Sequence, residues 1–405
     1  MDPSFRNLFE TRLQVIESVA IEGESQLRQD PANFVESLNN NSILDLLDLA
    51  AEANIPFIDI ERIGVLEDTD EDGGRLAHIV GSGLTASVFR HVVDKRVLDL
   101  GADKSIVAVK VFSPNQSSND KPKQSASNDQ DRFRTIMEEI RILRDPELAK
   151  HPNIVNLLFV GWRTGSLLPC LGLELGSYGS LEHILTVPGY SLSLLQRQNV
   201  MADVALGLHC LHCRGIYHGD LKPDNILIMR HPDPSRQLIA KVSDFGGSCR
   251  QSSDRSAPTY VTGLWLAPEV LHGDKAIDWA SVDIYAYALI VASIWSRPFF
   301  PLLQKLESSC YLKLFRTSLG RGPDFYRWLL IVKTRSLDSD GSVLKLALAG
   351  TSDTGRKFVL ALGPLLNPRY RERPNITTVV TDIIIPLTSN LKSRNIRYAW
   401  VNPAY

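Results

Sequence analysis

The sequence predicts an α+β protein in which a strand-rich region precedes a helical one. Two patterns carry this prediction. Short apolar runs recur through residues 75–175, whereas apolar residues at helical spacing recur after residue 180. Apolar residues make up 44% of the 405 residues and charged residues 22%, a composition typical of a globular protein with an ample core.

Two helices are expected ahead of the strand-rich region, over residues 5–29 and 33–53, because their apolar residues recur at helical spacing. They are either a docking or regulatory element or a helical cap that packs on the region that follows. We favour the cap, because the segment carries no chemical signature. The acidic, glycine-bearing run Glu67–Gly74 then predicts a surface linker.

The strand-rich region contains one predicted helix, over Arg132–Arg144. Residues 113–131 hold no aromatic residue and no aliphatic one beyond a single alanine. They cannot bury enough apolar surface to offset their ordering entropy, so we expect a disordered loop, with phosphorylation of its serines as the lesser alternative. Strands are predicted at Leu76–Val80, Ser87–Val93, Ile106–Phe112, Leu157–Trp162 and Cys170–Leu175.

Helical periodicity after residue 180 is strong in two segments and weaker in two more. The sequence shows no internal repeat. The helices are predicted at Leu194–Arg214, Ser281–Trp295, Phe325–Leu337 and Ile376–Leu387.

Charge and cysteine content exclude several classes of protein. Lys and Arg number 44 against 46 acidic residues, so nothing favours a nucleic-acid partner. Five cysteines suit a reducing compartment better than a disulfide framework. The longest apolar stretch, Val282–Trp295, contains Asp283 and is shorter than the roughly 20 residues of a membrane span. With no secretory signal at the N-terminus, we expect a soluble intracellular protein, cytoplasmic or nuclear.

The most informative segment is His218–Asn225, followed by Asp244-Phe-Gly. Its polar residues are the set that phosphoryl transfer from a metal nucleotide requires. Asp220 would orient the attacking hydroxyl and Lys222 would meet the transferring phosphate. Asn225 and Asp244 would hold Mg²⁺.

Two further motifs precede this segment. Gly81-Ser82-Gly83 lies in a strand–turn–strand context, where glycines let backbone N–H groups approach phosphates, although ordinary hairpins share the pattern. Lys110 is a lone cation in an apolar strand and needs solvent or a partner. Glu139 is the expected partner, because its four-residue step to Leu143 places both on one helix face, whereas Glu138 points about 100° away.

Cys210 and Cys213 form a C-x-x-C pair beside two histidines, a pattern found in zinc and redox sites. A second ligand pair at metal spacing is missing, so we interpret these residues as structural. His218 is likewise expected to pack under Phe245 rather than act as a base.

In order along the chain, these motifs make residues 73–388 resemble the eukaryotic-type Ser/Thr protein kinase family. The resemblance implies a bilobal fold, with a small antiparallel-sheet N-lobe (73–175), a helical C-lobe (176–388) and ATP between them. Residues 1–72 would be a helical extension with an acidic linker, and residues 389–405 a tail. The matching residues are Gly81, Gly83, Lys110, Glu139, Asp220, Asn225, Asp244 and Glu269.

The resemblance also implies roles. Lys110, Glu139, Asp220 and Lys222 would be catalytic, with Mg²⁺ on Asn225 and Asp244. Backbone groups from Glu174 to Gly176 would bind adenine, and Leu173 would guard the back pocket. ATP would contact Gly81, Ser82, Gly83, Val88, Ala108, Lys110, Glu174, Gly176 and Leu227.

Residues outside the nucleotide site are expected to support the C-lobe. Asp283 would anchor the backbone of the catalytic loop, and Glu269 would pair with Arg373. Lys222 before proline, and Thr262, are similar to Ser/Thr rather than tyrosine kinases.

Three features depart from the family pattern. Gly219 replaces the arginine of the catalytic loop, a non-RD pattern that removes the partner of a phosphorylated activation segment. Ala86 replaces the third glycine of the phosphate loop, and residues 297–362 match the family poorly.

The leading hypothesis is an active Ser/Thr protein kinase that uses Mg-ATP and protein hydroxyls, with its oligomeric state left open. The first alternative is a pseudokinase scaffold that binds nucleotide and partner proteins. The second is a small-molecule kinase, because His-Gly-Asp also opens the catalytic loop of choline- and aminoglycoside-type phosphotransferases. Lys222 and Ala267-Pro-Glu269 favour protein substrates.

Overall fold

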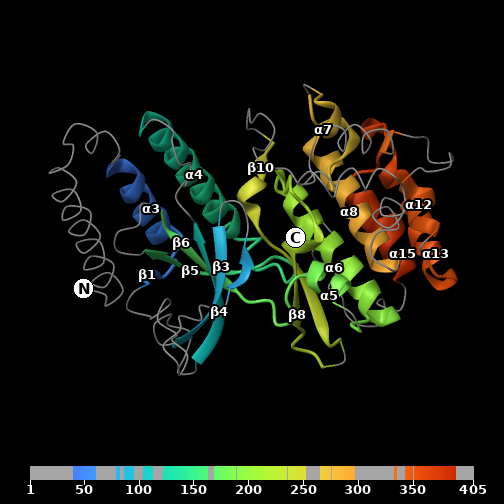
Figure 1. Cartoon of the computed structure of the whole chain (residues 1–405), viewed down its shortest axis with the longest axis horizontal. Helices are drawn as coiled ribbons and strands as arrows, with labels where there is room; N and C mark the ends of the chain where they lie inside the picture. Colours follow the sequence, from blue (N-terminus) through green and yellow to red (C-terminus); the bar gives the residue numbers. More distant parts are fainter. Residues whose placement is uncertain are drawn as a thin grey trace, which may run out of the picture. The chain divides into compact units, whose positions relative to one another are not determined.

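The chain forms two compact units, the first comprising residues 1–149 and 155–175 and the second residues 150–154 and 176–405 (Figure 1). The first is built on a sheet and the second is mainly helical, which confirms the bilobal α+β fold. The computed structural model describes residues 40–60, 79–82, 86–94, 104–112, 122–162, 168–187, 189–234, 236–251, 265–274, 276–296, 333–334, 343–349 and 351–388.

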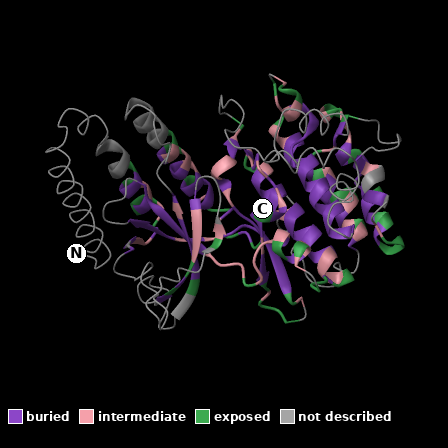
Figure 2. Ribbon diagram, in the orientation of Figure 1, coloured by how far each residue is buried: buried purple, intermediate pink, exposed green. Residues whose placement is uncertain are grey.

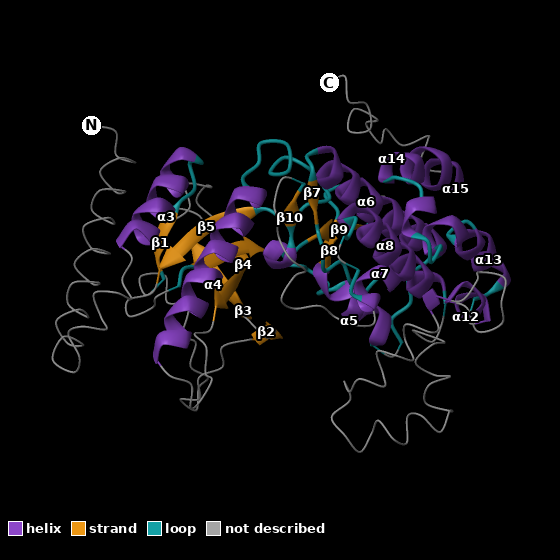
Figure 3. Ribbon diagram, turned by 90° about the horizontal axis from the view of Figure 1, so that it is seen from above, coloured by secondary structure: helices purple, strands orange, loops and turns teal. Residues whose placement is uncertain are grey.

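The sheet of the first unit has six strands in the order β1-β5-β6-β4-β3-β2. Strands β1 to β5 are labelled in Figure 3. The β2–β3, β3–β4, β4–β6 and β5–β6 pairs are antiparallel, but β1 pairs with β5 in parallel. The predicted antiparallel sheet is therefore correct for five strands and wrong for the sixth. The strands are β1 (Phe57–Asp59), β2 (Ile79–Ser82), β3 (Ala86–Asp94), β4 (Lys104–Phe112), β5 (Leu157–Trp162) and β6 (Cys170–Glu174).

Strand β1 comes from the segment that the sequence analysis assigned to helices and a linker. Three residues are too few to show strand periodicity, so only pairing with β5 defines this strand. Helix α3 (Asn40–Glu52) confirms the second predicted helix over most of its length, and it packs against helix α4 as a cap. The first predicted helix, residues 5–29, lies outside the described residues.

Helix α4 (Pro122–Leu143) begins ten residues earlier than predicted, so the loop prediction is wrong from residue 122 onward. Proline is tolerated in the first helical turn, where its missing N–H has no helical partner. Extending a helix that is already anchored by buried residues costs far less than starting one, which explains why a polar sequence continues it. Residues 113–121 lie outside the described part.

The second unit is organised around two long buried helices, α6 (Leu194–Cys213) and α8 (Trp279–Trp295), both confirming the sequence prediction. Helix α6 begins with a capping box in which Ser193 and Gln196 exchange hydrogen bonds. All residues of α8 from Ser281 to Trp295 are buried (Figure 2). No helix in the described part of the chain is long and apolar enough to cross a membrane.

Short strands and turns connect these helices, and the sequence analysis did not predict them. Two antiparallel strand pairs, β7 with β10 and β8 with β9, lie between α6 and α8 in the sequence. The elements between the two helices are β7 (Ile216–Tyr217), η3 (Pro223–Asn225), β8 (Ile226–Arg230), β9 (Leu238–Val242), η4 (Phe245–Gly247), β10 (Cys249–Arg250) and α7 (Pro268–His272), and α5 (Leu181–Thr186) precedes α6.

The C-terminal part of the second unit contains the predicted helix at 376–387, which is distorted. Its central turn, Val379–Ile384, is a π-helix between α14 (Ile376–Thr378) and α15 (Ile385–Leu387). Pro386 lacks the N–H that a regular helix needs at this position, which accounts for the wider turn. Of the helix predicted at 325–337, only Lys333 and Thr334 are described, and both are helical. The remaining elements are α12 (Val343–Ala349), α13 (Asp353–Leu360), η5 (Gly363–Leu366) and η6 (Tyr370–Glu372).

Candidate active site

In the first unit, the lysine of strand β4 forms a buried ion pair with helix α4. Lys110 lies opposite Val88 of β3 and Leu171 of β6 in the sheet register. Its Nζ lies 2.8 Å from Oε1 and 2.9 Å from Oε2 of Glu139. The lysine is 7% exposed and the glutamate 1%, so the two charges neutralise each other away from water.

The helical spacing that favoured Glu139 over Glu138 predicted this pair correctly. Ile136, Met137 and Ile140 are buried on α4 together with Glu139. Glu138 is partly exposed and pairs with Arg141 at 3.6 Å on the outer side of the same helix.

The predicted nucleotide-binding residues of the first unit lie on neighbouring strands of one sheet. Gly81 pairs with Val88 after a register shift in β2, and Ser82 pairs with Ser87. Ala108 is buried opposite Leu173. The carboxylate of Glu174 accepts hydrogen bonds from the backbone and side-chain amides of Asn156. Gly83 lies outside the described residues.

Gly176 begins the second unit, and its backbone explains why a glycine stands there. A Cβ at this position would lie 2.9 Å from the carbonyl oxygen of Gly179, closer than such contacts allow. Leu227, another predicted ATP contact, lies on β8 opposite Lys241. It also bridges to Ser180, just before helix α5.

The second unit brings the predicted catalytic-loop side chains together. Lys222 Nζ lies 2.6 Å from Oδ2 of Asp220. Asn225 Nδ2 donates to the Asp220 backbone carbonyl at 2.8 Å. The segment is a short 3₁₀ turn, η3, that begins at Pro223, and the proline fixes the backbone where Lys222 and Asn225 converge on Asp220.

A carboxylate from buried helix α8 holds the backbone of this loop, as predicted. Asp283 Oδ2 accepts from the His218 N–H at 2.8 Å, and Oδ1 accepts from the Gly219 N–H at 2.9 Å. His212 Nε2, near the end of α6, lies 2.9 Å from Asp283 Oδ2. Sequence reasoning treated His212 only as a member of a structural Cys–His cluster and missed this contact.

His218 is fully buried and serves the loop as a structural residue, as expected. Its ring lies 5.5 Å from that of Phe245. Nδ1 accepts from the Asp220 N–H at 3.3 Å, and Nε2 lies 3.0 Å from the Ser243 carbonyl oxygen. These contacts hold both ring nitrogens of His218 within the loop.

Gly219 occupies a backbone conformation that favours glycine. Its φ is +75°, in the left-handed region, while its N–H is bonded to Asp283. The sequence analysis considered only the loss of an arginine side chain at this position. The structure adds a second reason for the residue, since any side chain there would strain the loop.

The two predicted metal ligands emerge side by side at the base of the β8–β9 hairpin. Ile226 pairs with Val242 in register, and the N–H and Oγ of Ser243 both bond to the Asn225 carbonyl at 2.9 and 3.0 Å. Asp244 follows with φ of 63°, an unusual conformation for a residue other than glycine.

The donor chemistry of this pair suits Mg²⁺. Because Asn225 directs its amide nitrogen at Asp220, its amide oxygen faces the other way, and Asp244 adds a carboxylate. Among the described residues, no group of three or more His, Cys, Asp or Glu side chains is placed to hold a metal. Magnesium commonly takes one or two protein oxygens and completes its shell with water and phosphates, so the two residues fit it.

An acidic side chain beside the catalytic loop was also missed. Glu182 belongs to helix α5, which contacts η3. Burial, and secondly the charge of Asp224, raise the pKa of Glu182 to about 7. An acid in the first turn of a short helix gave no sequence signal for this effect.

A buried ion pair in the second unit ties the start of α7 to the segment after η6. Arg373 Nη1 and Nη2 donate to Glu269 at 2.7 and 2.9 Å, as predicted. Lys333 is buried beside them and donates to the Leu266 carbonyl. Burial lowers the pKa of Lys333 well below its usual value. Thr262 lies outside the described residues.

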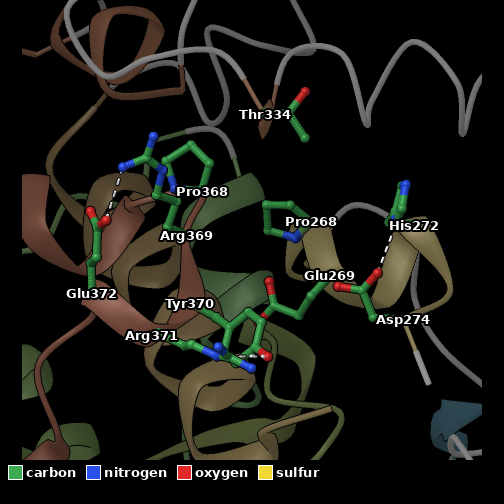
Figure 4. A pocket seen from close by; sticks show the side chains of 10 residues that line it. All are labelled: Pro268, Glu269, His272, Asp274, Thr334, Pro368, Arg369, Tyr370, Arg371 and Glu372. Atoms are coloured by element: carbon green, nitrogen blue, oxygen red, sulfur yellow. Dashed lines mark hydrogen bonds and ion pairs between the residues drawn. The ribbon is translucent and has the colours of Figure 1, made fainter. Parts of the chain in front are cut away.

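A cavity of about 420 Å³ lies next to this pair, between α7 and η6 (Figure 4). Its three acidic side chains are already paired: Glu269 with Arg373, Glu372 with Arg369 and Asp274 with His272. None of the predicted catalytic or nucleotide-binding residues lines it. The lining residues are Pro268, Glu269, His272, Asp274, Thr334, Pro368, Arg369, Tyr370, Arg371 and Glu372.

A sheet-based unit with a buried Lys–Glu pair, and a helical unit with an Asp–Lys–Asn loop before Asp-Phe-Gly, define the class of the protein kinases. The protein kinase domain family matches residues 75–380, and the chain belongs to this family. Members of this family typically bind ATP and use it to phosphorylate proteins.

Relatives with curated descriptions are similar over part of the chain. A probable serine/threonine-protein kinase gdt4 of Dictyostelium discoideum is 30% identical over 232 residues, 55% of this chain and 13% of that protein. The probable serine/threonine-protein kinase drkD of the same organism is 37% identical over 150 residues, 36% of this chain and 11% of that protein. The mouse dual specificity testis-specific protein kinase 1 is 32% identical over 164 residues, which are 38% of this chain and 25% of that protein. The chain thus spans a quarter or less of these relatives.

Proposed function

We propose that the chain is a serine/threonine protein kinase that transfers the γ-phosphate of Mg-ATP to protein hydroxyl groups. The observation that carries the proposal is that the polar side chains expected to act on the nucleotide, and those expected to act on the substrate hydroxyl, are in each case held together by hydrogen bonds within their own unit. Lys110 is paired with Glu139 in one unit. In the other unit, Lys222 and Asn225 each lie within hydrogen-bond distance of Asp220. Two of the similar relatives bear the name serine/threonine-protein kinase, which supports the choice of hydroxyl.

Each residue of the catalytic loop has a proposed task in the reaction. Asp220 accepts a hydrogen bond from the substrate hydroxyl and takes its proton as the new P–O bond forms, while the bond from the γ-phosphorus to the bridging oxygen breaks and ADP leaves. Lys222, now bonded to Asp220, offsets charge on the transferring phosphoryl group. Lys110 binds phosphate oxygens of the nucleotide while Glu139 fixes its position.

The metal is proposed to bind Asn225 and Asp244. When bound, Mg²⁺ neutralises charge on the phosphates of the nucleotide. The chain itself orients Asn225, through the hydrogen bonds of Asn225 to Asp220 and of Ser243 to the Asn225 carbonyl.

The remaining nucleotide contacts are proposed to come from both units. Main-chain groups of Glu174 and Gly176 bind adenine, and apolar side chains cover its faces. Backbone N–H groups of the glycine-rich turn bind phosphates. The set is Gly81, Ser82, Gly83, Val88, Ala108, Glu174, Gly176 and Leu227.

Control of activity is proposed not to depend on an arginine in the catalytic loop. Phosphate on an activation segment usually orders it by pairing with arginine. Gly219 has no side chain to make that pair, and the backbone of the loop is instead fixed by Asp283.

The test is transfer of labelled γ-phosphate from Mg-ATP to the protein itself or to a generic basic protein. Asp220→Asn should lower the rate at least about 1,000-fold, because the hydroxyl loses its general base and orienting carboxylate. Asp382→Asn changes an exposed aspartate of the same unit and should leave the rate unchanged. Intact nucleotide binding without transfer by the wild-type protein, with any divalent metal, would instead identify a nucleotide-binding scaffold.

A further inference from the structure

The segment at residues 40–60 is built into the sheet-based unit. Strand β1 covers the β5 edge of the sheet, with Phe57 opposite Val160. Ile58 and Ile60 belong to the same buried cluster as Val107 and Val109 of strand β4, the strand that carries Lys110. A Cβ added to Gly161 would lie 2.3 Å from Ile60, so the sheet leaves room for this isoleucine by having a glycine beneath it.

The end of helix α3 is held by an arginine from the end of helix α4. Arg144 Nη2 donates to the Ala53 carbonyl at 2.6 Å and to the Asn54 carbonyl at 3.0 Å. Helix α3 has no basic residue in its own last turn. A cation at a helix C-terminus satisfies exposed carbonyls and opposes the negative end of the helix dipole, so Arg144 supplies the charge that α3 lacks.

Helix α4 is covered on more than one side where it carries Glu139. Ile136, Met137, Ile140, Ile142 and Leu143 are all at most 4% exposed. Residues at such different angles around a helix cannot all face one sheet, so a second element must cover the outer face. Helix α3 contacts α4, and its Leu46 and Leu47 are fully buried (Figures 1 and 2).

We propose that residues 40–60 form a built-in brace that holds α4 at the position where Glu139 pairs with Lys110, and that Arg144 is the positioning residue of the brace. The importance of the brace for phosphoryl transfer rests on the proposed function, whereas its effect on the position of α4 does not. Arg144 acts at a distance: it follows the last turn of α4, five residues after Glu139, and its backbone N–H bonds to Ile140.

The brace has two attachments at its C-terminal end, one to the core beneath the strand that carries Lys110 and one to the residue that follows the helix of Glu139. Strand β1 and Ile58 pack on the core beneath the lysine strand. The end of α3 is bonded to the residue that follows the glutamate helix. Loss of the arginine attachment leaves the sheet intact and frees the C-terminal turn of α4, which makes the effect separable from unfolding.

The first experiment compares Arg144→Ala with Arg141→Ala in the full chain by hydrogen exchange. Arg141 is three residues away on α4 but is exposed and pairs with Glu138. Arg144→Ala should speed exchange of the amides at 136–143 about tenfold, the consequence of losing hydrogen bonds to a charged donor. Arg141→Ala should change it less than twofold, and Arg144→Lys should restore part of the protection. Equal exchange in the two alanine variants overturns the proposal.

The second experiment is a double-mutant cycle on Mg-ADP affinity, with Glu139→Gln as the partner change. If Arg144 acts through Glu139, Arg144→Ala should weaken binding about fivefold in the wild-type background and less than twofold in the Glu139→Gln background. Equal weakening in both backgrounds overturns the positioning role. Hydrogen exchange is measured without nucleotide and needs no phosphate transfer. The exchange experiment therefore tests the brace even if the protein proves unable to transfer phosphate.

Discussion

Among the described residues, each of the two units contains a buried pair of a cation and a carboxylate, and these two pairs look alike at first. Lys110 lies 2.8 and 2.9 Å from the two oxygens of Glu139, and Arg373 lies 2.7 and 2.9 Å from those of Glu269. All four residues are at most 7% exposed. Burial and distance therefore do not distinguish them.

What distinguishes them is the chemistry of the cation and its other neighbours. Arg373 also donates to the backbone carbonyls of Asn367 at 2.8 Å and Ser281 at 2.9 Å, and its guanidinium lies 4.7 Å from the Tyr285 ring. It therefore joins three separate segments. Lys110 carries a compact ammonium group on a strand, paired with a helix that is itself braced. The first arrangement suits structural support and the second suits contact with a ligand.

The contrast predicts opposite results for conservative exchanges, and the largest effect is expected at Arg373. Arg373→Lys keeps the charge but gives up the planar fork, so the bonds to the Asn367 and Ser281 carbonyls cannot all be kept. Stability should fall by about 3 kcal/mol, measured by urea unfolding, because buried carbonyls lose charged donors. Arg371→Lys, at an exposed site in the same segment, is the matched control and should change stability by less than about 0.5 kcal/mol.

For Lys110→Arg we expect the opposite result, a loss of activity with little loss of stability. Lys110→Arg keeps a cation beside Glu139, so the free energy of unfolding should change by less than about 1 kcal/mol. The rate of phosphate transfer should fall about 100-fold, since a bulkier planar group displaces the point charge that the phosphates require. Steady-state kinetics and urea unfolding on the same preparation measure both. A variant that lost stability and kept activity would show that the two pairs do not differ as described.

The sequence was sufficient for the residues that share a motif or a periodicity. The step from Glu139 to Leu143 identified the partner of Lys110, and the order of motifs identified the loop from Asp220 to Asn225 and its anchor Asp283. These inferences succeed because helical spacing and local turn chemistry depend on residues that are close together in the sequence.

Elements defined by distant contacts were not predictable in this way. Strand β1 exists because the β5 edge accepts it, and three residues carry no pattern of their own. From the sequence, Arg144 is an ordinary polar residue at the end of a predicted helix, and its role depends on the end of α3, which lies beside it. Lys333 lies in a stretch without family motifs, so its burial next to Glu269 had no sequence signal. The positive φ of Gly219 was likewise not predicted, because the sequence at this position shows only that the arginine is missing.

The comparison extends to His151 of the second unit, a buried residue whose side chain stays uncharged at neutral pH. Burial, and then the charges of His209 and Lys241, lower the pKa of His151 from 6.5 to about 4. Between these values the unfolded chain binds a proton that the folded chain does not, so stability falls as the pH falls from 6.5 toward 4. Lowering the pH from 7 to 5 should cost about 2 kcal/mol through this residue.

Urea unfolding of His151→Asn at several pH values checks this prediction. In the wild type, the Asn153 N–H donates to His151 Nδ1 at 3.2 Å. The side-chain oxygen of asparagine can accept the same hydrogen bond, but asparagine does not titrate. The variant is expected to be less stable at pH 7, where it leaves space in the core, yet to lose about 2 kcal/mol less than the wild type on going to pH 5. His183→Asn, at an exposed site, should reproduce the wild-type pH profile. If His151→Asn shows the wild-type slope as well, the acid sensitivity of the second unit arises from other groups, and the burial of His151 does not set it.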